Sequence, residues 1–182
     1  LARSFFFLLY QFLNHKYDKV DVVFISHSTE AERVSEDDFF KVGTYGGTIV
    51  SSCLDLELDI VEKEYHPNSW NIYTFYCGDG ENWTSDNETC INLFKKVKNV
   101  SQLTGYCEIN EHYRGMVDDT TEAIAPDGSP WPSFSAWKND EMDNLWSKLD
   151  PICDNKFKKV MVGDTEHIWT AFNLLFGGKD TK

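Results

Sequence analysis

The stretch that decides the fold is Gly46-Gly47-Thr48-Ile49-Val50-Ser51-Ser52, taken together with Cys77-Gly78-Asp79-Gly80-Glu81-Asn82-Trp83. The first stretch opens an apolar segment with helical periodicity, and the second closes a segment rich in aromatic and β-branched residues. Between them lies one helix-and-strand step of an α/β sheet. Because ligands collect beyond the carboxyl ends of the strands in such sheets, we expect Thr48 and Asp79 to meet in one crevice.

One hydroxyl and one carboxylate in a crevice suit a hard cation such as Mg²⁺, which prefers oxygen ligands and keeps several waters. Each motif also has a simpler interpretation. Thr48 can be the cap of the helix that follows it, and Asp79-Gly80 can be a tight turn after a strand. The two motifs by themselves leave both interpretations open.

Working outward, apolar residues recur with helical spacing in five places and form short continuous runs in four. We expect helices over residues 2–15 and 48–65, after a capping box of Ser85 and Glu88, along Met142, Leu145, Trp146 and Leu149 with Asn139 as a cap, and after Asp164 or Thr165. We expect strands over residues 20–25, 70–77, 103–109 and 157–162, an edge strand or loop over 33–38, and a long loop over 112–136.

This alternation predicts a single α/β domain over residues 1–182, doubly wound, with a mainly parallel sheet and helices on both faces. Doubly wound folds begin with a central strand, whereas this chain begins with a helix. We therefore expect the first central strand to be missing from this chain and to precede residue 1. The strands over residues 20–25 and 70–77 are then the two that lack a neighbour, and they should not pair with each other.

Composition narrows the range of partners and locations. The net charge of −13 argues against nucleic acid, because phosphate binding needs clustered Lys and Arg. There is no apolar run of about 20 residues that could span a membrane. The five cysteines form no C-x-x-C pair, and their odd number favours free thiols in a reducing cytoplasm. The carboxylates of Glu108 and Glu111 are explained by solvation near a loop.

Several separate motifs, in order, resemble the YeaH/YhbH family of bacterial proteins. They are Phe5-Phe6-Phe7-Leu8-Leu9-Tyr10, Val23-Phe24-Ile25-Ser26-His27-Ser28-Thr29-Glu30-Ala31, Gly46-Gly47-Thr48-Ile49-Val50-Ser51-Ser52, Trp70-Asn71-Ile72-Tyr73, Asp79-Gly80-Glu81-Asn82-Trp83, and the closing stretch 164–176. The family is regarded as related to von Willebrand factor A domains. The chain departs from the family pattern at Ser28, where a second histidine is expected, and at Tyr45, where serine is usual.

The resemblance implies a metal-ion-dependent adhesion site. Such sites combine a D-x-S-x-S motif with a threonine and an aspartate from two later segments, and by resemblance Thr48 and Asp79 take those two roles. The D-x-S-x-S motif has no match in this chain, and the family carries it upstream of the first helix. We therefore expect Mg²⁺, or another divalent cation, in the complete protein and not in this fragment.

The function implied is that of a non-enzymatic protein-interaction module in a bacterial stress-response or sporulation pathway. Its implied partner is a PrkA-type serine protein kinase, and His27, Gly47, Ser51 and Trp83 are weaker candidates for partner contacts. The alternative is a metal-dependent hydrolase that uses the same crevice. No base or nucleophile with a placed partner stands out in the sequence, which counts against the hydrolase.

Overall fold

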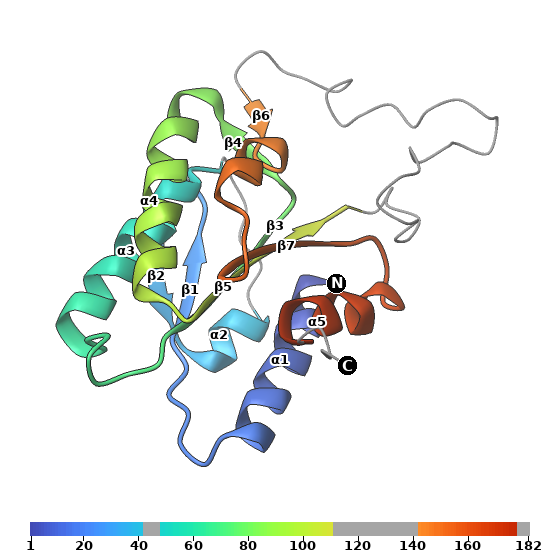
Figure 1. The fold of residues 1–182 in the computed structure, drawn as a ribbon. Helices are drawn as coiled ribbons and strands as arrows, with labels where there is room; N and C mark the ends of the chain where they lie inside the picture. The colour runs from blue at the N-terminus through green and yellow to red at the C-terminus, as the bar shows by residue number, and fades with distance from the viewer. Residues whose placement is uncertain (42–47, 111–141, 178–182) are drawn as a thin grey trace.

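Three parallel strands form the central sheet of the computed structural model, which describes residues 1–41, 48–110 and 142–177 (Figure 1). Their order is β3-β5-β7, with β3 at Tyr73–Gly78, β5 at Leu103–Ile109 and β7 at Phe157–Val162. The strands predicted over 103–109 and 157–162 are confirmed. β5 is paired on both edges and is buried along nearly its whole length, as its continuous apolar run predicted.

Helices cover both faces of this sheet, as the sequence predicted. One face carries α3 (Val50–Glu64) and α4 (Asn87–Val100), and the other carries α1 (Ala2–Lys16) and α5 (His167–Phe176) (Figure 1). The residues of α3 that are buried are Val50, Cys53, Leu54, Ile60 and Val61, and their spacing is that of one face of a helix. The predicted helices over residues 2–15 and 48–65 are therefore confirmed to within two residues.

Side chains of the central strands alternate between two cores. Tyr76 and Tyr106 stack with ring centroids 5.3 Å apart in the core beneath α3 and α4. Their chain neighbours Cys77 and Cys107 face the opposite core, beneath α1 and α5. This two-sided burial is what a parallel sheet between helical layers requires.

The remaining strands form two antiparallel pairs. β1 (Phe24–His27) pairs with β2 (Ala31–Val34), and β4 (Glu81–Trp83) pairs with β6 (Met142–Asn144). The prediction of a strand over residues 20–25 in a parallel sheet was wrong. Regular pairing begins only at Phe24, and this pairing is antiparallel. The segment 33–38 is the end of β2 and the start of α2 (Glu36–Lys41). The strand expected from residue 70 starts at Tyr73, because Ser69 and Trp70 donate their N–H groups to the carbonyl of His66.

Three helix-start predictions are wrong. Ser85 lies in a short 3₁₀ turn (Thr84–Asp86), and α4 begins after it at Asn87 without a side-chain cap. The segment from Met142 to Leu149 is not one helix, because pairing with β4 draws its first residues into β6 and a 3₁₀ helix (Ser147–Ile152) follows. α5 begins at His167, and the Asp164 carboxylate accepts a hydrogen bond from the N–H of Glu166 instead of capping the helix. Asn139 and the loop at 112–136 lie outside the described residues.

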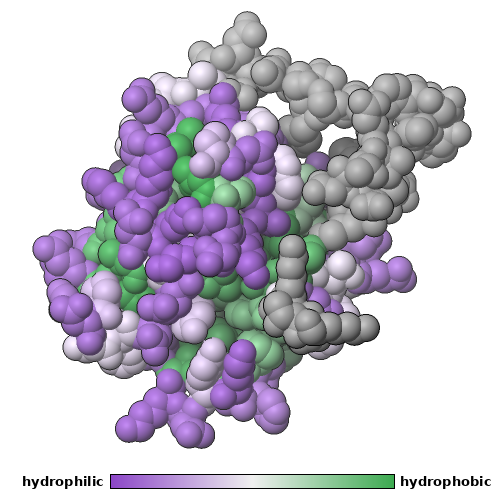
Figure 2. All heavy atoms as spheres, viewed as in Figure 1, coloured by the Kyte–Doolittle hydropathy of each residue, from purple (hydrophilic) through white to green (hydrophobic). Residues whose placement is uncertain are grey.

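The surface is largely hydrophilic on the face shown in Figure 2, with hydrophobic residues visible between the elements. None of the helices in the described ranges is long and apolar enough to cross a membrane. All five cysteines are free thiols: Cys53, Cys90 and Cys107 are buried, Cys77 is half-buried and Cys153 is exposed. Burial raises the pKa of the Cys53 thiol to about 12, so this thiol stays protonated and unreactive.

Candidate functional site

Three chain segments that are far apart in sequence meet where β1 and β3 end. The N–H of Ile49 donates to the carbonyl of Ser28 at 2.9 Å, and the N–H of Trp83 donates to the carbonyl of Thr48 at 3.4 Å. We call residues 27–28, 48–51 and 79–83 the junction. The second bond joins the Thr48 backbone to Trp83, the last residue of β4, four positions after Asp79. Gly47 lies outside the described residues.

The start of α3 is capped from the β4 region and not by its own residues. The Oδ1 atom of Asn82, which is fully buried, accepts a hydrogen bond from the N–H of Val50 at 3.0 Å. The Oδ2 atom of Asp86 accepts one from the N–H of Ser51, also at 3.0 Å. A carboxylate here is favoured by the positive end of the helix dipole. The interpretation of Thr48 as a cap is therefore wrong, since α3 begins at Val50, with Ile49 at the cap position.

Asp79 shapes a tight turn between β3 and β4. Its Oδ1 atom accepts a hydrogen bond from the N–H of Glu81 at 3.1 Å, and Gly80 has a φ of +87°. Glycine is needed at position 80 for a second reason, because a Cβ atom there would lie 2.5 Å from Oε2 of Glu108. The turn interpretation of Asp79-Gly80 is confirmed, and within residues 1–41, 48–110 and 142–177 the other carboxylate oxygen of Asp79 accepts no hydrogen bond.

His27 is a neutral imidazole beside Asp79. Burial lowers its pKa, and the nearby Ser28 backbone and the charge of Asp79 oppose that shift only in part. Its Nδ1 atom is buried and has no hydrogen-bond partner among the described residues. The indole N–H of Trp83 is also buried and has no hydrogen-bond partner among the described residues. Both polar atoms belong to the junction, and a buried polar atom without a partner marks a place where a ligand or water is expected.

The sequence analysis missed the importance of Glu108. The expectation of a solvated carboxylate was wrong, because Glu108 is only 1% exposed and ends the buried part of β5. Burial raises its pKa to about 7, although Asn144 and Tyr106 donate hydrogen bonds to it at 3.4 and 3.3 Å. A carboxylate inside an otherwise apolar strand run was the available signal. Asn82 and Asp86 were also missed, since no local pattern shows that they cap a distant helix.

The donor atoms of the junction suit a hard cation but do not complete its shell. Thr48 offers a hydroxyl and Asp79 a carboxylate, which are oxygen ligands of the kind Mg²⁺ prefers. Within the described ranges, no three His, Cys, Asp or Glu side chains group closely enough to hold a metal ion. Ser51, which was predicted only as a partner contact, donates its backbone N–H to Asp86. An octahedral ion bound here would need further ligands from water, a partner or other segments of the protein.

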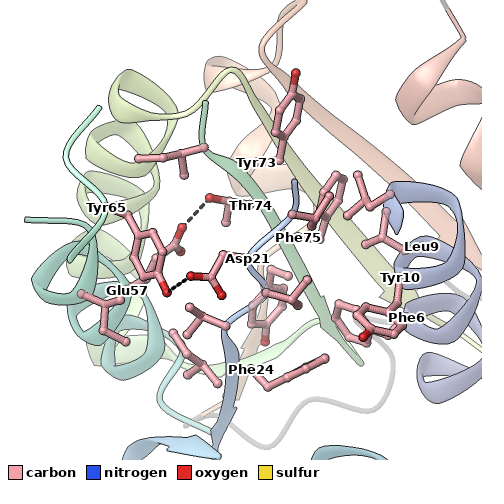
Figure 3. Close-up of a pocket in the computed structure, with 18 of the residues that line it drawn as sticks. Phe6, Leu9, Tyr10, Asp21, Phe24, Glu57, Tyr65, Tyr73, Thr74 and Phe75 are labelled. Atoms are coloured by element: carbon pink, nitrogen blue, oxygen red, sulfur yellow. Dashed lines mark hydrogen bonds between the residues drawn. The ribbon is translucent and has the colours of Figure 1, made fainter. Parts of the chain in front are cut away.

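A cavity of about 680 Å³ opens beside the junction (Figure 3). It is lined by all four residues of β1 and by Tyr73 to Cys77 of β3, and α1 and α3 close its sides. β1 pairs with β2 and β3 pairs with β5, so the two strands do not pair with each other, as the sequence predicted. The wall of the cavity is mainly apolar. The apolar residues that line it are Phe6, Leu9, Leu13, Val20, Val22, Val23, Phe24, Ile25, Phe39, Leu54, Ile60, Val61, Ile72 and Phe75.

Two carboxyl groups, those of Asp21 and Glu57, also line the cavity, and Tyr65 donates a hydrogen bond to Asp21 at 2.8 Å. The hydroxyl of Thr74 bonds to Glu57, and Ser101 lies 3.0 Å from the Thr74 hydroxyl (Figure 3). Burial raises the pKa of Glu57 to about 7 from 4.5, and the Thr74 hydrogen bond opposes that shift. Glu57 is half-buried, and it lines the cavity.

We expect Glu57→Gln to change how the stability of the chain depends on pH. The folded-state pKa is raised, so folding retains the proton that the unfolded chain loses, and stability falls as the pH rises from about 4.5 to about 7. The variant lacks this loss. The free energy of unfolding of Glu57→Gln minus that of the parent should therefore rise by about 2 kcal/mol at most between about pH 5.5 and about pH 8. Urea unfolding at the two pH values measures it.

The matched control is Glu62→Gln, an exposed position on the same helix. Its difference from the parent should be the same at both pH values. Other carboxyl groups, Glu108 included, are present in all three proteins and cancel in the comparison. A Glu57→Gln difference that is constant across the range would contradict the assignment of a proton to Glu57.

Comparison with known proteins places the chain in a family. Residues 1–179 match the family described as "Protein of unknown function (DUF444)", and the chain belongs to it. A UPF0229 protein of Bacillus velezensis is 46% identical over 181 residues, which cover 100% of this chain and 39% of that protein. A UPF0229 protein of Ruminiclostridium cellulolyticum is 50% identical over 113 residues, covering 62% of this chain and 28% of its own length.

These relatives confirm the resemblance to the YeaH/YhbH family, which is the UPF0229 group. A UPF0229 protein of Oceanobacillus iheyensis adds 48% identity over 114 residues, with 63% of this chain and 29% of that protein covered. The chain thus spans well under half the length of the relatives it matches. No solved structure matches the chain.

Proposed function

We propose that the chain is part of a non-enzymatic protein-interaction module of the metal-dependent adhesion-site type, built on a von Willebrand factor A-like fold. The observation that carries the proposal is the junction, where the Thr48 and Asp79 segments are held together by the bond from Trp83 N–H to the Thr48 carbonyl. The parallel order β3-β5-β7 with helices on both faces also supports it.

In the proposed site, the ligands from the domain carry less negative charge than the positive charge of the cation. In the complete protein, Thr48 would hold Mg²⁺ through its hydroxyl, and the Asp79 carboxylate would bind the ion through water. Asp79 already holds its turn through the Glu81 N–H, which fixes the orientation of the carboxylate. With few direct charges from the domain, a cation held here would keep enough positive charge to bind a carboxylate of a protein partner as a further oxygen ligand. His27 and Trp83, whose buried N atoms have no partner in the described chain, supply further contacts.

The proposed partner is a PrkA-type serine protein kinase, in a stress-response or sporulation pathway. This part of the proposal is supported by the family resemblance and by no contact in the structure. The net charge of −13 is consistent with a protein partner and not with nucleic acid.

Replacing Asp79 by alanine is expected to weaken Mg²⁺ binding by the full-length protein about 10-fold or more, the usual effect of losing a group that orients metal-bound water. Thr48→Ala should weaken it similarly. Asp55→Ala, which removes the same charge from an exposed position on α3, is the matched control and should bind as the parent does. Isothermal titration calorimetry measures all four affinities.

Equal affinity in all four proteins would overturn the metal site and leave Asp79 as a turn residue. Partner capture that needs Mg²⁺ and shows no turnover would support the adhesion role. Mg²⁺-dependent hydrolysis lost in Asp79→Ala would favour the hydrolase instead.

A further inference from the structure

We propose that the groove between α3 and α4 is a docking site for a basic amphipathic helix of a partner protein. The groove has a volume of about 840 Å³ and is lined by residues of both helices and of the loop that follows α3. The proposal stands on the shape of the groove, its apolar bottom and the charges on its two sides. It does not depend on the proposed metal site.

The shape of the groove fits one more helix. Figure 1 shows α3 and α4 side by side on one face of the sheet, and a third helix can pack its side chains into the groove between two neighbouring helices. The part of α3 that lines the groove runs from Ser52 to Glu62, which is about 15 Å of helix, or about three turns. His66 and Pro67, just past the end of α3, also line it. A helix of three to four turns therefore matches its length.

The bottom of the groove is apolar. Leu56, Leu58 and Val61 line it from α3, and Val100 lines it from α4. Val61 is buried and the other three side chains are half-buried, so part of this aliphatic surface remains in contact with water. A helix that docks in a groove inserts apolar side chains at helical spacing, and this removes such surface from water. The bottom of the groove thus requires an apolar face on the partner.

The side of the groove formed by α3 is acidic. Asp55, Asp59 and Glu62 are exposed and are spaced by four and three positions, so they lie along one face of the helix. Lys63 pairs with Asp59 at 2.6 Å, whereas Asp55 and Glu62 form no ion pair within the described ranges. The whole chain carries a net charge of −13. A basic partner complements the acidic side, and the overall field speeds its approach.

Lys96 makes the two sides of the groove different. Its side chain is exposed on α4 and lines the groove from the side that faces the α3 carboxylates. A bound helix therefore directs its basic residues toward α3, inserts its apolar residues between the two helices and carries no basic residue next to Lys96. This arrangement selects an amphipathic helix with basic residues on one flank, and it disfavours a uniformly basic segment.

The test is the binding of a synthetic peptide to the full-length protein, measured by fluorescence anisotropy in about 0.15 M salt with EDTA. The probe is a labelled helix of about four turns, with leucines at i, i+3, i+4 and i+7 and lysines along one flank. A scrambled peptide has the same composition but no apolar face. EDTA removes Mg²⁺, so failure of the metal site does not affect the result. We expect the scrambled peptide to bind about 10-fold more weakly than the probe.

Charge reversal separates the groove from the overall charge of the chain. Asp55→Lys combined with Glu62→Lys should weaken binding of the probe about 10-fold, because two attractions become repulsions. The matched control is Asp18→Lys combined with Glu166→Lys, which changes the net charge equally at exposed positions after α1 and before α5, on the other face of the sheet. Charges more than about 8 Å apart are largely screened in this buffer, so the control should bind within about 2-fold of the parent.

Lys96→Glu should have the opposite effect and tighten binding of the probe about 3-fold, because it removes a repulsion. Damage to the fold would weaken binding in every variant, so this change of sign separates docking from a structural effect. The proposal is overturned if the probe does not bind at about 1 mM, or if the scrambled peptide binds as tightly. Equal losses in the two double variants, or unchanged binding in Lys96→Glu, would also overturn it.

Discussion

Replacing Phe94 by alanine is expected to lower the free energy of unfolding by about 3–5 kcal/mol, the usual cost of removing a fully buried aromatic ring. Phe94 is completely buried on α4, and its ring meets Tyr76 at 6.0 Å, Tyr106 at 6.1 Å and Phe157 at 5.5 Å. These partners come from β3, β5 and β7. One ring therefore ties the helix layer to all three central strands, and its removal leaves a cavity that these aromatic rings cannot easily fill.

Equilibrium unfolding in urea, followed by circular dichroism, measures this loss. The control is Phe7→Ala, since the Phe7 ring is 58% exposed, and we expect that change to stay within about 1 kcal/mol of the parent. The free energy of unfolding of a native protein is only about 5–15 kcal/mol, so the Phe94 variant should be close to unfolding at physiological temperature. A loss as small as that of Phe7→Ala would show that α4 is not packed on the sheet as described.

Replacing Asn82 by alanine is the second change with a large expected effect, about 2–3 kcal/mol. The change removes the acceptor that Val50 N–H uses at the start of α3, and it removes the donor that bonds to Oδ1 of Asn87 at 3.0 Å. Loss of a helix cap costs about 0.5–2 kcal/mol, with a buried Val50 N–H at the upper end, and loss of the Asn87 hydrogen bond adds about 0.5–1.5 kcal/mol. Val50 and Asn82 are fully buried, so water cannot readily replace the bond.

Two measurements separate this effect from a general loss of stability. Urea unfolding gives the total loss in free energy of unfolding. Hydrogen exchange should show that the amides at the start of α3 exchange faster than those of α4. The control is Asn99→Ala, an exposed position in the last turn of α4, where alanine should be neutral or slightly stabilising. Unchanged exchange at Val50 in the Asn82 variant would contradict the capping role.

The long elements could be predicted because their information is local. β5, β7 and the inward face of α3 each carry a continuous or periodic apolar pattern, and their bounds were confirmed within two residues. The short elements could not be predicted in this way. The segment starting at Met142 has a helix-like apolar spacing, yet it becomes a strand because β4 offers a pairing partner more than 50 residues away. Pairing between distant segments overrides weak local preference.

The same distinction applies to the candidate site. The motifs around Thr48 and Asp79 identified two loops, and the structure joins those loops at the junction. The groups that hold the junction together were invisible in the sequence. Asn82 and Asp86 act on α3 across more than 30 residues, and Glu108 lies against Gly80 and Asn144, which are distant in sequence. Such roles depend on tertiary contacts that no spacing rule encodes.

The register of the central sheet has a consequence for how the chain folds. Tyr73 pairs with Leu103, 30 positions later, and Thr104 pairs with Phe157, 53 positions later. The entropy lost in closing a loop grows only slowly with its length, by about 0.6 kcal/mol per doubling, but distant pairing is slow to nucleate. We therefore expect the β3-α4-β5 unit to form first and β7 to join last. Until β7 arrives, the outer edge of β5 is open, so the unit is most prone to aggregate during that interval of folding.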